Sequence, residues 1–190
     1  MKDLKIGCVI MAAGNGSRFG ENKLTILVDG KSMIRRAMEA VPKDLETVVV
    51  TQYAEVSILA EEFGFSCVSN EHPEWGISHT IALGTEHLSH CDGILYMVSD
   101  QPLLRRESVE KLVEVWKSQP HRIAGASHNG KRGNPCLFPR KFFPDLCALN
   151  GDTGGNTVIR ANAEALLLVD FAKQELRDVD TPETLRDISK

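Results

Sequence analysis

The sequence predicts an α/β fold in which helices cover both faces of a mostly parallel β-sheet, giving three layers. Three observations support this fold class. Short apolar segments alternate along the chain with segments of helical periodicity. The apolar segments are nearly continuous, as expected for strands that are buried on both faces. Glycine-rich and acidic loops follow several of these segments, which is where open α/β sheets bind their ligands.

The first half of the chain predicts four strand–helix units. Ser32 follows Gly30 and predicts a helix start, because its hydroxyl can accept a hydrogen bond from the first helical turn. Gly64 predicts a helix end, because glycine readily adopts the left-handed conformation found there. The expected strands are Lys5–Met11, Thr47–Thr51, Phe65–Ser69 and Gly93–Ser99, and the expected helices are Ser32–Val41, Ala54–Phe63, Ser78–Leu88 and Ser108–Ser118.

The second half of the chain is less regular. A polar turn from His128 to Gly133 separates two short apolar segments, and Thr181 followed by Pro182 predicts the start of a closing helix. The chain contains no repeat, linker or low-complexity segment, so we expect a single domain over residues 1–190. The expected strands are Ile123–Ala126, Pro135–Phe138, Ala165–Val169 and Leu176–Val179, and the expected helices are Lys141–Leu149, Thr157–Glu164 and Pro182–Ser189.

Composition excludes several classes of protein. The formal net charge of −4 disfavours a nucleic-acid partner, which would require a basic face. No apolar run approaches the roughly 20 residues that a membrane helix needs, so no membrane partner is expected. The N-terminal Met1–Lys5 segment lacks the apolar stretch of a signal peptide. Five cysteines without a C-x-x-C pair favour a reducing cytoplasm, and no two histidines are spaced as in H-x-x-x-H or H-E-x-x-H.

The loop after the first predicted strand, Met11–Lys23, has the composition of a phosphate-binding loop. Its glycines allow backbone N–H groups to approach an anion, and Arg18 and Lys23 add positive charge. A dinucleotide-binding G-x-G-x-x-G fails at Phe19, and no glycine is spaced as in a Walker A loop. The remaining alternative is an ordinary glycine-rich turn. The predicted nucleotide-binding residues here are Ala12, Ala13, Gly14, Asn15, Gly16, Ser17, Arg18 and Lys23.

Two carboxylates are the candidate metal ligands. Asp100 follows a buried strand, where a carboxylate is costly unless it meets a cation. Asp180 follows the expected last strand, and Asp178 is expected to point to the other side of that strand. Mg²⁺ is commonly held by one or two carboxylates together with phosphate oxygens, so it is the expected metal. The alternative is that Asp100 caps a turn and Asp180 caps a helix.

Three further loops are candidates for substrate contacts. Gly76, Ser78 and Thr80 offer a close backbone approach and two hydroxyls to a base or ribose, although Ser78 could simply cap a helix. The basic turn Gly130–Pro135 and the glycine-rich loop Gly151–Asn156 could line an acceptor pocket or be surface turns.

Together these segments resemble the MobA-like NTP transferase family over nearly the whole chain. The opening Ala-Ala-Gly, together with R-G-N-P and G-D-x-G, is similar to the MocA branch of that family. The motifs are the first loop, G-I-S-x-T at Gly76–Thr80, D-x-P at Asp100–Pro102, R-G-N-P at Arg132–Pro135, G-D-x-G at Gly151–Gly154 and D-V-D-T-P-E at Asp178–Glu183.

The resemblance implies a Rossmann-like fold of the nucleotide-diphospho-sugar transferase type and a Mg²⁺-dependent cytidylyltransferase. The implied reaction moves CMP from CTP to the terminal phosphate of molybdopterin, and the product would pass to a molybdenum hydroxylase of the xanthine-dehydrogenase type. The implied catalytic residues are Arg18, Lys23 and Asp100. The implied acceptor-binding residues are Arg132, Gly133, Asn134, Pro135 and Asp152.

Two departures from the family pattern bear on the acceptor and on the competing functions. Phe19 replaces a methionine, and Asn156 replaces an arginine expected to touch the anionic acceptor, a role that Lys131, Arg132 or Arg160 could take.

Three other functions compete with this one. One alternative is the same chemistry with GTP or with another acceptor, such as a sugar or alcohol phosphate. A second is a nucleotide-binding accessory protein that catalyses nothing. A third, a nicotinamide oxidoreductase, is disfavoured by the loop composition.

Overall fold

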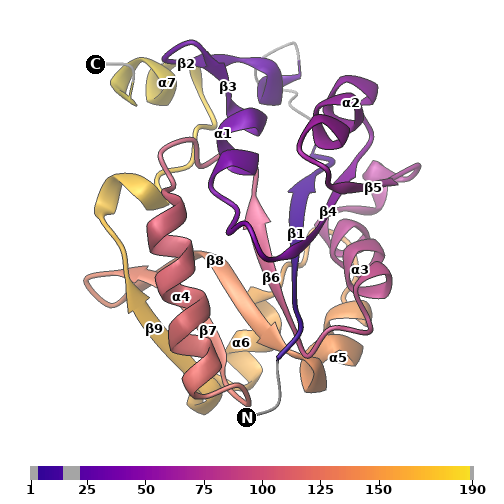
Figure 1. Ribbon diagram of the computed structural model, residues 1–190, viewed down its shortest axis with the longest axis vertical. Coiled ribbons are helices and arrows are strands. Elements are labelled where there is room, and N and C mark those ends of the chain that lie inside the picture. Colours follow the sequence, from indigo (N-terminus) through magenta and orange to yellow (C-terminus); the bar gives the residue numbers. More distant parts are fainter. Residues whose placement is uncertain (1–3, 15–21, 189–190) are drawn as a thin grey trace.

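The protein forms a seven-stranded sheet with strand order β5-β4-β1-β6-β8-β7-β9 (Figure 1). The structure is a computed structural model and describes residues 4–14 and 22–188. Only β8 runs antiparallel to its neighbours in this sheet. The strands are β1 (Ile6–Ala12), β4 (Glu46–Thr51), β5 (Ser66–Ser69), β6 (Gly93–Val98), β7 (Ile123–His128), β8 (Lys131–Pro139) and β9 (Leu166–Asp170), with β2 (Leu27–Val28) and β3 (Lys31–Ser32) forming a separate small ladder.

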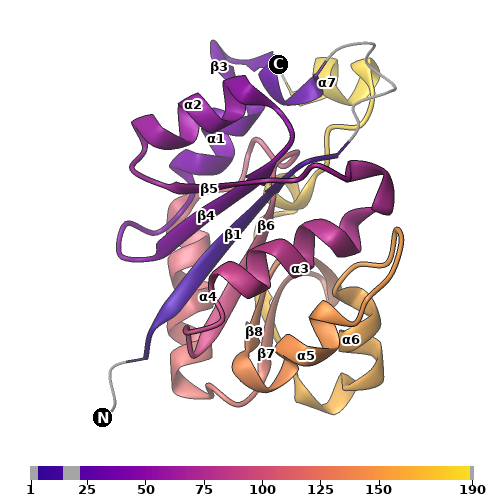
Figure 2. The same cartoon turned by 90° about the vertical axis from the view of Figure 1, so that its right-hand side faces the viewer.

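Helices cover both faces of the sheet, which confirms the predicted three-layer α/β class (Figure 2). One face carries α1 (Met33–Glu39), α2 (Ala54–Glu62) and α4 (Arg106–Ser118). The other face carries α3 (Ile77–His87), α5 (Phe143–Cys147) and α6 (Asn156–Ala161). A short last helix, α7 (Pro182–Ile188), lies beside β2 and β3 (Figure 1). Among the described residues, no helix is long and apolar enough to cross a membrane.

Alternate residues of the central strand build two separate cores. Cys8 and Ile10 of β1 point into the core under α1, α2 and α4, whereas Val9 points into the core under α3, α5 and α6. The helix α3 lies so close to β1 that a Cβ at Gly84 would stand 2.6 Å from Val9 Cγ1. The near-continuous apolar run of this strand is therefore a consequence of burial on both faces.

Two predicted helix boundaries are confirmed by their capping bonds. The Ser32 hydroxyl accepts a hydrogen bond from the Arg35 N–H at 3.3 Å, at the start of α1. Gly64 has φ +72° after α2, and its N–H donates to the Glu61 carbonyl at 2.9 Å. The next N–H, of Phe65, donates to the Ala60 carbonyl at 3.0 Å, which completes a Schellman motif.

The predicted strand Leu176–Val179 is wrong. The chain forms a short 3-10 turn, η5 (Lys173–Leu176), and then an irregular segment. The Val179 N–H donates to the Asp100 carbonyl at 2.9 Å, so this segment crosses the end of β6 instead of pairing along a strand. Val179 is fully buried against Val28 and Met33, which explains its strand-like apolar character. Val179 is therefore apolar because it packs beside the β2–β3 ladder and not because it belongs to a strand.

The segment Arg132–Pro135, predicted as part of a connecting loop, lies within β8. The turn is confined to Asn129 and Gly130, whose φ angles of +48° and +77° are typical of a two-residue hairpin turn. The ladder between β7 and β8 shifts register between Gly125, which pairs with Cys136, and Ser127, which pairs with Arg132. Such irregularities bend a strand and re-aim its side chains. The predicted helices Lys141–Leu149 and Thr157–Glu164 are also shorter than expected, with 3-10 turns at Arg140–Phe142 and Ala163–Ala165.

Candidate active site

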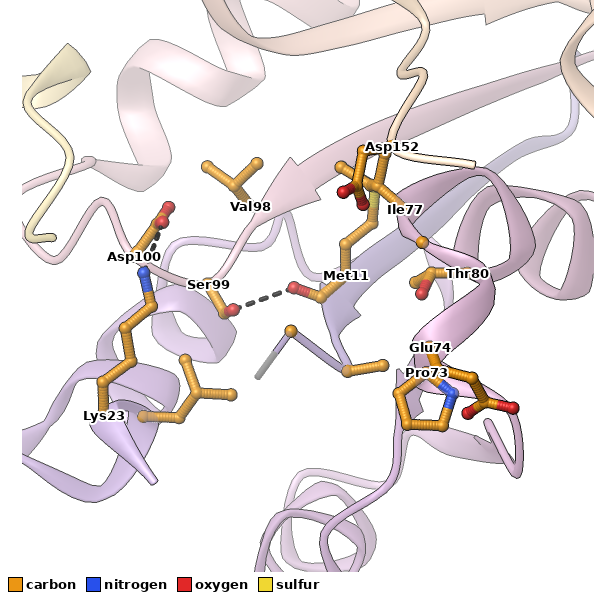
Figure 3. A pocket seen from close by; sticks show the side chains of 14 residues that line it. Met11, Lys23, Pro73, Glu74, Ile77, Thr80, Val98, Ser99, Asp100 and Asp152 are labelled. Atoms are coloured by element: carbon orange, nitrogen blue, oxygen red, sulfur yellow. Dashed lines mark hydrogen bonds and ion pairs between the residues drawn. The ribbon is translucent and has the colours of Figure 1, made fainter. Parts of the chain in front are cut away.

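A cavity of about 410 Å³ opens at the edge of the sheet where β1 and β6 end (Figure 3). Parallel strands bring the loops that follow them to this edge, so residues distant in sequence meet here. Lys23 and Asp100 lie on one side of the cavity, and Thr80, Glu74 and Asp152 lie across from them (Figure 3). The lining residues are Met11, Ala13, Gly14, Lys23, Leu24, Pro73, Glu74, Gly76, Ile77, Thr80, Val98, Ser99, Asp100 and Asp152.

Lys23 bridges two carboxylates at one side of this cavity. Its Nζ lies 2.9 Å from Asp100 Oδ2 and 3.0 Å from Asp180 Oδ1. Burial alone would lower the pKa of Lys23, but the two carboxylates outweigh it and raise that pKa above its ordinary value. The ammonium therefore stays charged at neutral pH. Asn22 fixes the start of this turn, because its Oδ1 accepts a hydrogen bond from the Leu24 N–H at 3.1 Å.

Asp178 lies near Lys23, Asp100 and Asp180, although it was expected to point to the other side of a strand. Because residues 177–180 are irregular, Asp178 is not held on the opposite face of a strand. Gln101 Nε2 donates to Asp178 Oδ1 at 2.8 Å. Desolvation and the negative charge of Asp100 raise the pKa of the Asp178 carboxyl. Three carboxylates thus share one region. The Lys23 ammonium pairs directly with Asp100 and Asp180, and its charge also acts on Asp178.

Three side chains that we did not predict from the sequence hold the backbone at the C-terminal end of β1. The carbonyls of Ala12–Gly14 accept, in order, from Thr51 Oγ1 at 2.9 Å, Gln52 Nε2 at 2.7 Å and the Tyr53 hydroxyl at 2.9 Å. These donors are the last residue of β4 and the two residues after it, and β4 pairs with β1, so the carboxyl-edge rule could have identified them. They fix the backbone at the start of the predicted phosphate loop. The predicted residues Asn15, Gly16, Ser17 and Arg18 lie outside the described residues.

Gly76, just before α3, and Thr80, in the first turn of α3, are two predicted contacts that line the cavity, whereas Ser78 does not. The Ser78 side chain is buried and does not line it, and the Ser78 N–H donates to the Gly151 carbonyl at 3.1 Å. Ser78 therefore ties the start of α3 to the Gly151–Asp152 turn, and Asp152 lines the cavity from that turn.

Replacing Gly76 with alanine is expected to lower the free energy of unfolding by about 3 kcal/mol. Gly76 has φ +86°, and an added Cβ would lie 2.4 Å from the Gly151 carbonyl carbon. Gly154→Ala is the matched control, since an added Cβ there meets nothing within 4 Å. Urea denaturation followed by circular dichroism measures both variants. Equal stability of the two variants would contradict this role for Gly76.

A second, smaller cavity of about 140 Å³ adjoins the first and shares Met11, Ile77 and Val98 with it. Arg132 and Asn134 of the predicted acceptor site line this second cavity, whereas Asp152 lines the first. The other two predicted acceptor residues line neither: Gly133 faces Leu176, and Pro135 is buried. The remaining walls of the second cavity are mostly apolar, and they include Ile81, Tyr96, Phe138, Leu146 and Ile159.

Comparison with known proteins identifies relatives over most of the chain. Residues 8–166 match the MobA-like NTP transferase domain. The chain is 27% identical to the purine catabolism protein PucB of Bacillus subtilis, over 92% of this chain and 91% of PucB. It is 30% identical to a molybdenum cofactor guanylyltransferase of Shewanella sp. strain MR-4, over 71% of this chain and 68% of that protein.

Solved structures share the same fold. A nucleotidyl transferase from Methanothermobacter superposes with a TM-score of 0.82 at 20% identity, covering 97% of this chain and 96% of that one. A CMP-2-keto-3-deoxy-manno-octonic acid synthetase complexed with CTP gives 0.76 at 17% identity, covering 97% of each chain. The Rv0371c protein of Mycobacterium tuberculosis H37Rv, in a complex with manganese, gives 0.78 at 20% identity and also covers 97% of each chain.

The fold and the matched domain define a nucleotidyltransferase, an enzyme that acts on nucleoside triphosphates. Two features agree with that class: the cavity at the carboxyl edge of the sheet, and the cation held between two carboxylates beside it. The chain belongs to the MobA-like NTP transferase family.

Proposed function

We propose that this enzyme transfers CMP from CTP to the terminal phosphate of molybdopterin and releases pyrophosphate. The observation that carries the proposal is the Lys23 ammonium between Asp100 and Asp180 at the side of the large cavity. Relatives named molybdenum cofactor guanylyltransferase support the acceptor. A relative named for purine catabolism agrees with delivery of the product to a molybdenum hydroxylase of the xanthine-dehydrogenase type, since xanthine is a purine.

The carboxylates fit a divalent metal, for which we propose Mg²⁺. Asp100 and Asp180 present hard oxygen donors that already converge on one positive charge, Lys23 Nζ. A metal bound there would neutralise charge on the triphosphate during transfer. A divalent cation and an ammonium would not both occupy the space between the carboxylates. Lys23 would therefore turn towards the α-phosphate when the metal and nucleotide are bound.

The proposed chemistry needs positioning and charge neutralisation more than covalent catalysis. An oxygen of the acceptor phosphate attacks the α-phosphorus, and the bond from that phosphorus to the pyrophosphate oxygen breaks. Lys23, together with Arg18, would stabilise the negative charge that grows on the α-phosphate. Backbone N–H groups of Gly14–Ser17 would hold the other phosphate oxygens. Gly76 and Thr80 line the cavity at the side where the nucleoside would lie.

The proposed preference for CTP rests on Ala13 and on the resemblance of the loops to the MocA branch. The Ala13 methyl lies at the cavity wall, and its carbonyl is held by Gln52 Nε2 at 2.7 Å. A methyl group at this held position leaves less room for a base than a glycine would, which favours a pyrimidine. The second candidate is transfer from GTP or to another phosphorylated acceptor, such as a sugar or alcohol phosphate, and the guanylyltransferase relatives favour the GTP alternative.

Pyrophosphate release tests the proposed reaction. The purified enzyme is incubated with molybdopterin and Mg²⁺ together with CTP, GTP or ATP. Release with CTP is expected to exceed release with GTP by at least about tenfold, and chelation of the metal is expected to stop it. A clear preference for GTP would overturn the base assignment. Release that requires a sugar or alcohol phosphate in place of molybdopterin would overturn the acceptor.

A further inference from the structure

Arg132 is a half-buried cation whose described hydrogen-bond acceptors are all neutral. Its Nη1 donates to the Gly133 carbonyl at 3.2 Å and to Cys136 Sγ at 3.1 Å, and its Nη2 donates to Asn156 Oδ1 at 2.8 Å. Burial raises the pKa of the Cys136 thiol, so the sulfur is uncharged at neutral pH. No carboxylate in the described part of the chain compensates this guanidinium, which keeps its positive charge at every physiological pH.

The fold holds this guanidinium in one place. Arg132 and Cys136 lie on the same face of β8, since they are four positions apart in one strand, and both side chains approach Gly125 of β7. The aliphatic part of the Arg132 side chain packs against Gly125, where an added Cβ would lie 3.4 Å from Arg132 Cγ. Asn156, the first residue of α6, then holds the end of the side chain. A guanidinium has five N–H donors, and the three contacts described above use three of them, so two remain for a ligand.

Arg132 lines the second cavity but not the first, which holds Lys23 and Asp100. A group bound to Arg132 is therefore a different group from the phosphate that reacts at the first cavity. Met11, Ile77 and Val98 line both cavities, and the walls of the second cavity also include Tyr96 and Phe138. The Arg132 site thus offers an uncompensated positive charge at one end of a mostly apolar cavity.

We propose that Arg132, positioned by Asn156, binds a second anionic group of the acceptor. This inference rests on the proposed transfer to a phosphorylated acceptor and specifies its class. The acceptor carries a reacting phosphate, a ring or other apolar body, and a separate negative charge. Arg132 recognises that charge, and Asn156 is a positioning residue. Asn156 supplies a neutral oxygen, so it orients the guanidinium without neutralising it.

Binding of phenyl phosphate tests this site without CTP turnover or molybdopterin. The probe combines a ring with an oxyanion, and benzyl alcohol is its neutral counterpart. Titrations followed by ¹⁵N-edited NMR report both affinity and location, through the signals of Gly133, Asn156 and Gly14. Wild-type enzyme is expected to bind phenyl phosphate with shifts at Gly133 and Asn156. Arg132→Ala is expected to weaken this binding by about tenfold.

Asn156→Asp separates a positioning role from simple packing. Asn156 is exposed, so the substitution leaves the fold intact, and the aspartate retains an oxygen for Arg132. It also gives Arg132 a counter-charge. We expect it to weaken phenyl phosphate binding at least as much as Asn156→Ala, whereas a purely structural role predicts that the aspartate restores binding. Lys131→Ala and Arg160→Ala are controls that remove one positive charge each from exposed nearby positions, and both are expected to bind as wild type does.

Four results would overturn the inference. They are equal affinity for benzyl alcohol, unchanged binding in Arg132→Ala, wild-type binding in Asn156→Asp, and shifts confined to Gly14 and the first cavity. Loss of binding in Lys131→Ala or Arg160→Ala with binding retained in Arg132→Ala would assign the charge to that other residue. Failure of the pyrophosphate assay alone would leave these binding results standing, so the two proposals fail separately.

Discussion

The Asp100→Asn enzyme is expected to release pyrophosphate about a thousandfold more slowly than wild type, with its fold unchanged. Asp100 is one of the two carboxylates that converge on Lys23, and only about a fifth of its side chain is exposed (22%). Asparagine keeps the shape of the side chain but removes the negative charge that would hold a divalent metal. Steady-state rates at saturating CTP and Mg²⁺ measure the effect.

Asp178→Asn is the matched control for this prediction. It removes the same charge from the same region, and the asparagine oxygen can still accept from Gln101 Nε2. Because the described hydrogen bonds and ion pairs of the Lys23 ammonium are with Asp100 and Asp180 and not with Asp178, the replacement of Asp178 is expected to change the rate far less. Full activity in Asp100→Asn would contradict the metal role and would favour an accessory protein that binds nucleotide without catalysis.

Lys23→Met is expected to lower kcat/KM for CTP by about a hundredfold to a thousandfold, because it removes a positive charge directed at the α-phosphate. A second effect follows from the contacts of Lys23 with Asp100 and Asp180 at 2.9 and 3.0 Å. Without the ammonium, the two carboxylates have no shared cation. The nucleotide-free variant is therefore expected to bind Mn²⁺ about tenfold more tightly than wild type, as measured by electron paramagnetic resonance.

Lys31→Met controls for the change in net charge. Lys31 is half exposed and pairs with Glu39 at 2.8 Å on the β3–α1 segment. Its replacement is expected to leave both kcat/KM and Mn²⁺ affinity unchanged. Weaker Mn²⁺ binding in Lys23→Met would show that the ammonium and the metal do not compete for the two carboxylates, and a wild-type kcat would remove Lys23 from the reaction.

The sequence was sufficient to place Lys23, Asp100 and Asp180 together because the rule behind that placement is topological. Loops that follow parallel strands meet at one edge, and this holds even when an element boundary is misjudged. The rule accounts for Lys23 and Asp100, which follow β1 and β6. Asp180 is an exception, since it reaches Lys23 from an irregular segment, so its expected position is right although the strand expected before it is absent. Which roles these residues have in catalysis stays a prediction.

Other parts of the site could not be predicted because tertiary contacts overrode local signals. Arg132 and Gly133 belong to the predicted turn from His128 to Gly133, yet both lie in β8, where a register shift accommodates them. Val179 has a strand-like environment because it is buried against Val28 and Met33. The hydrogen bond from Arg132 to Asn156 joins residues that are 24 positions apart in different elements, and no local pattern encodes it.

Asp180 lies just before the peripheral helix α7, so we expect denaturant to abolish activity before it unfolds the sheet. No residue of α7 is buried. This helix contacts the rest of the protein through Leu185 and Ile188, which pack on Val28, Met33 and Val179, and through an exposed ion pair of 2.8 Å between Asp187 and Arg177. A peripheral unit of this kind opens at a lower free-energy cost than the sheet beneath it. A low concentration of denaturant would thus displace the Asp180 carboxylate and abolish activity while most of the secondary structure persists. The denaturant concentration at which half of the activity is lost is therefore expected to be lower than the one at which half of the protein is unfolded.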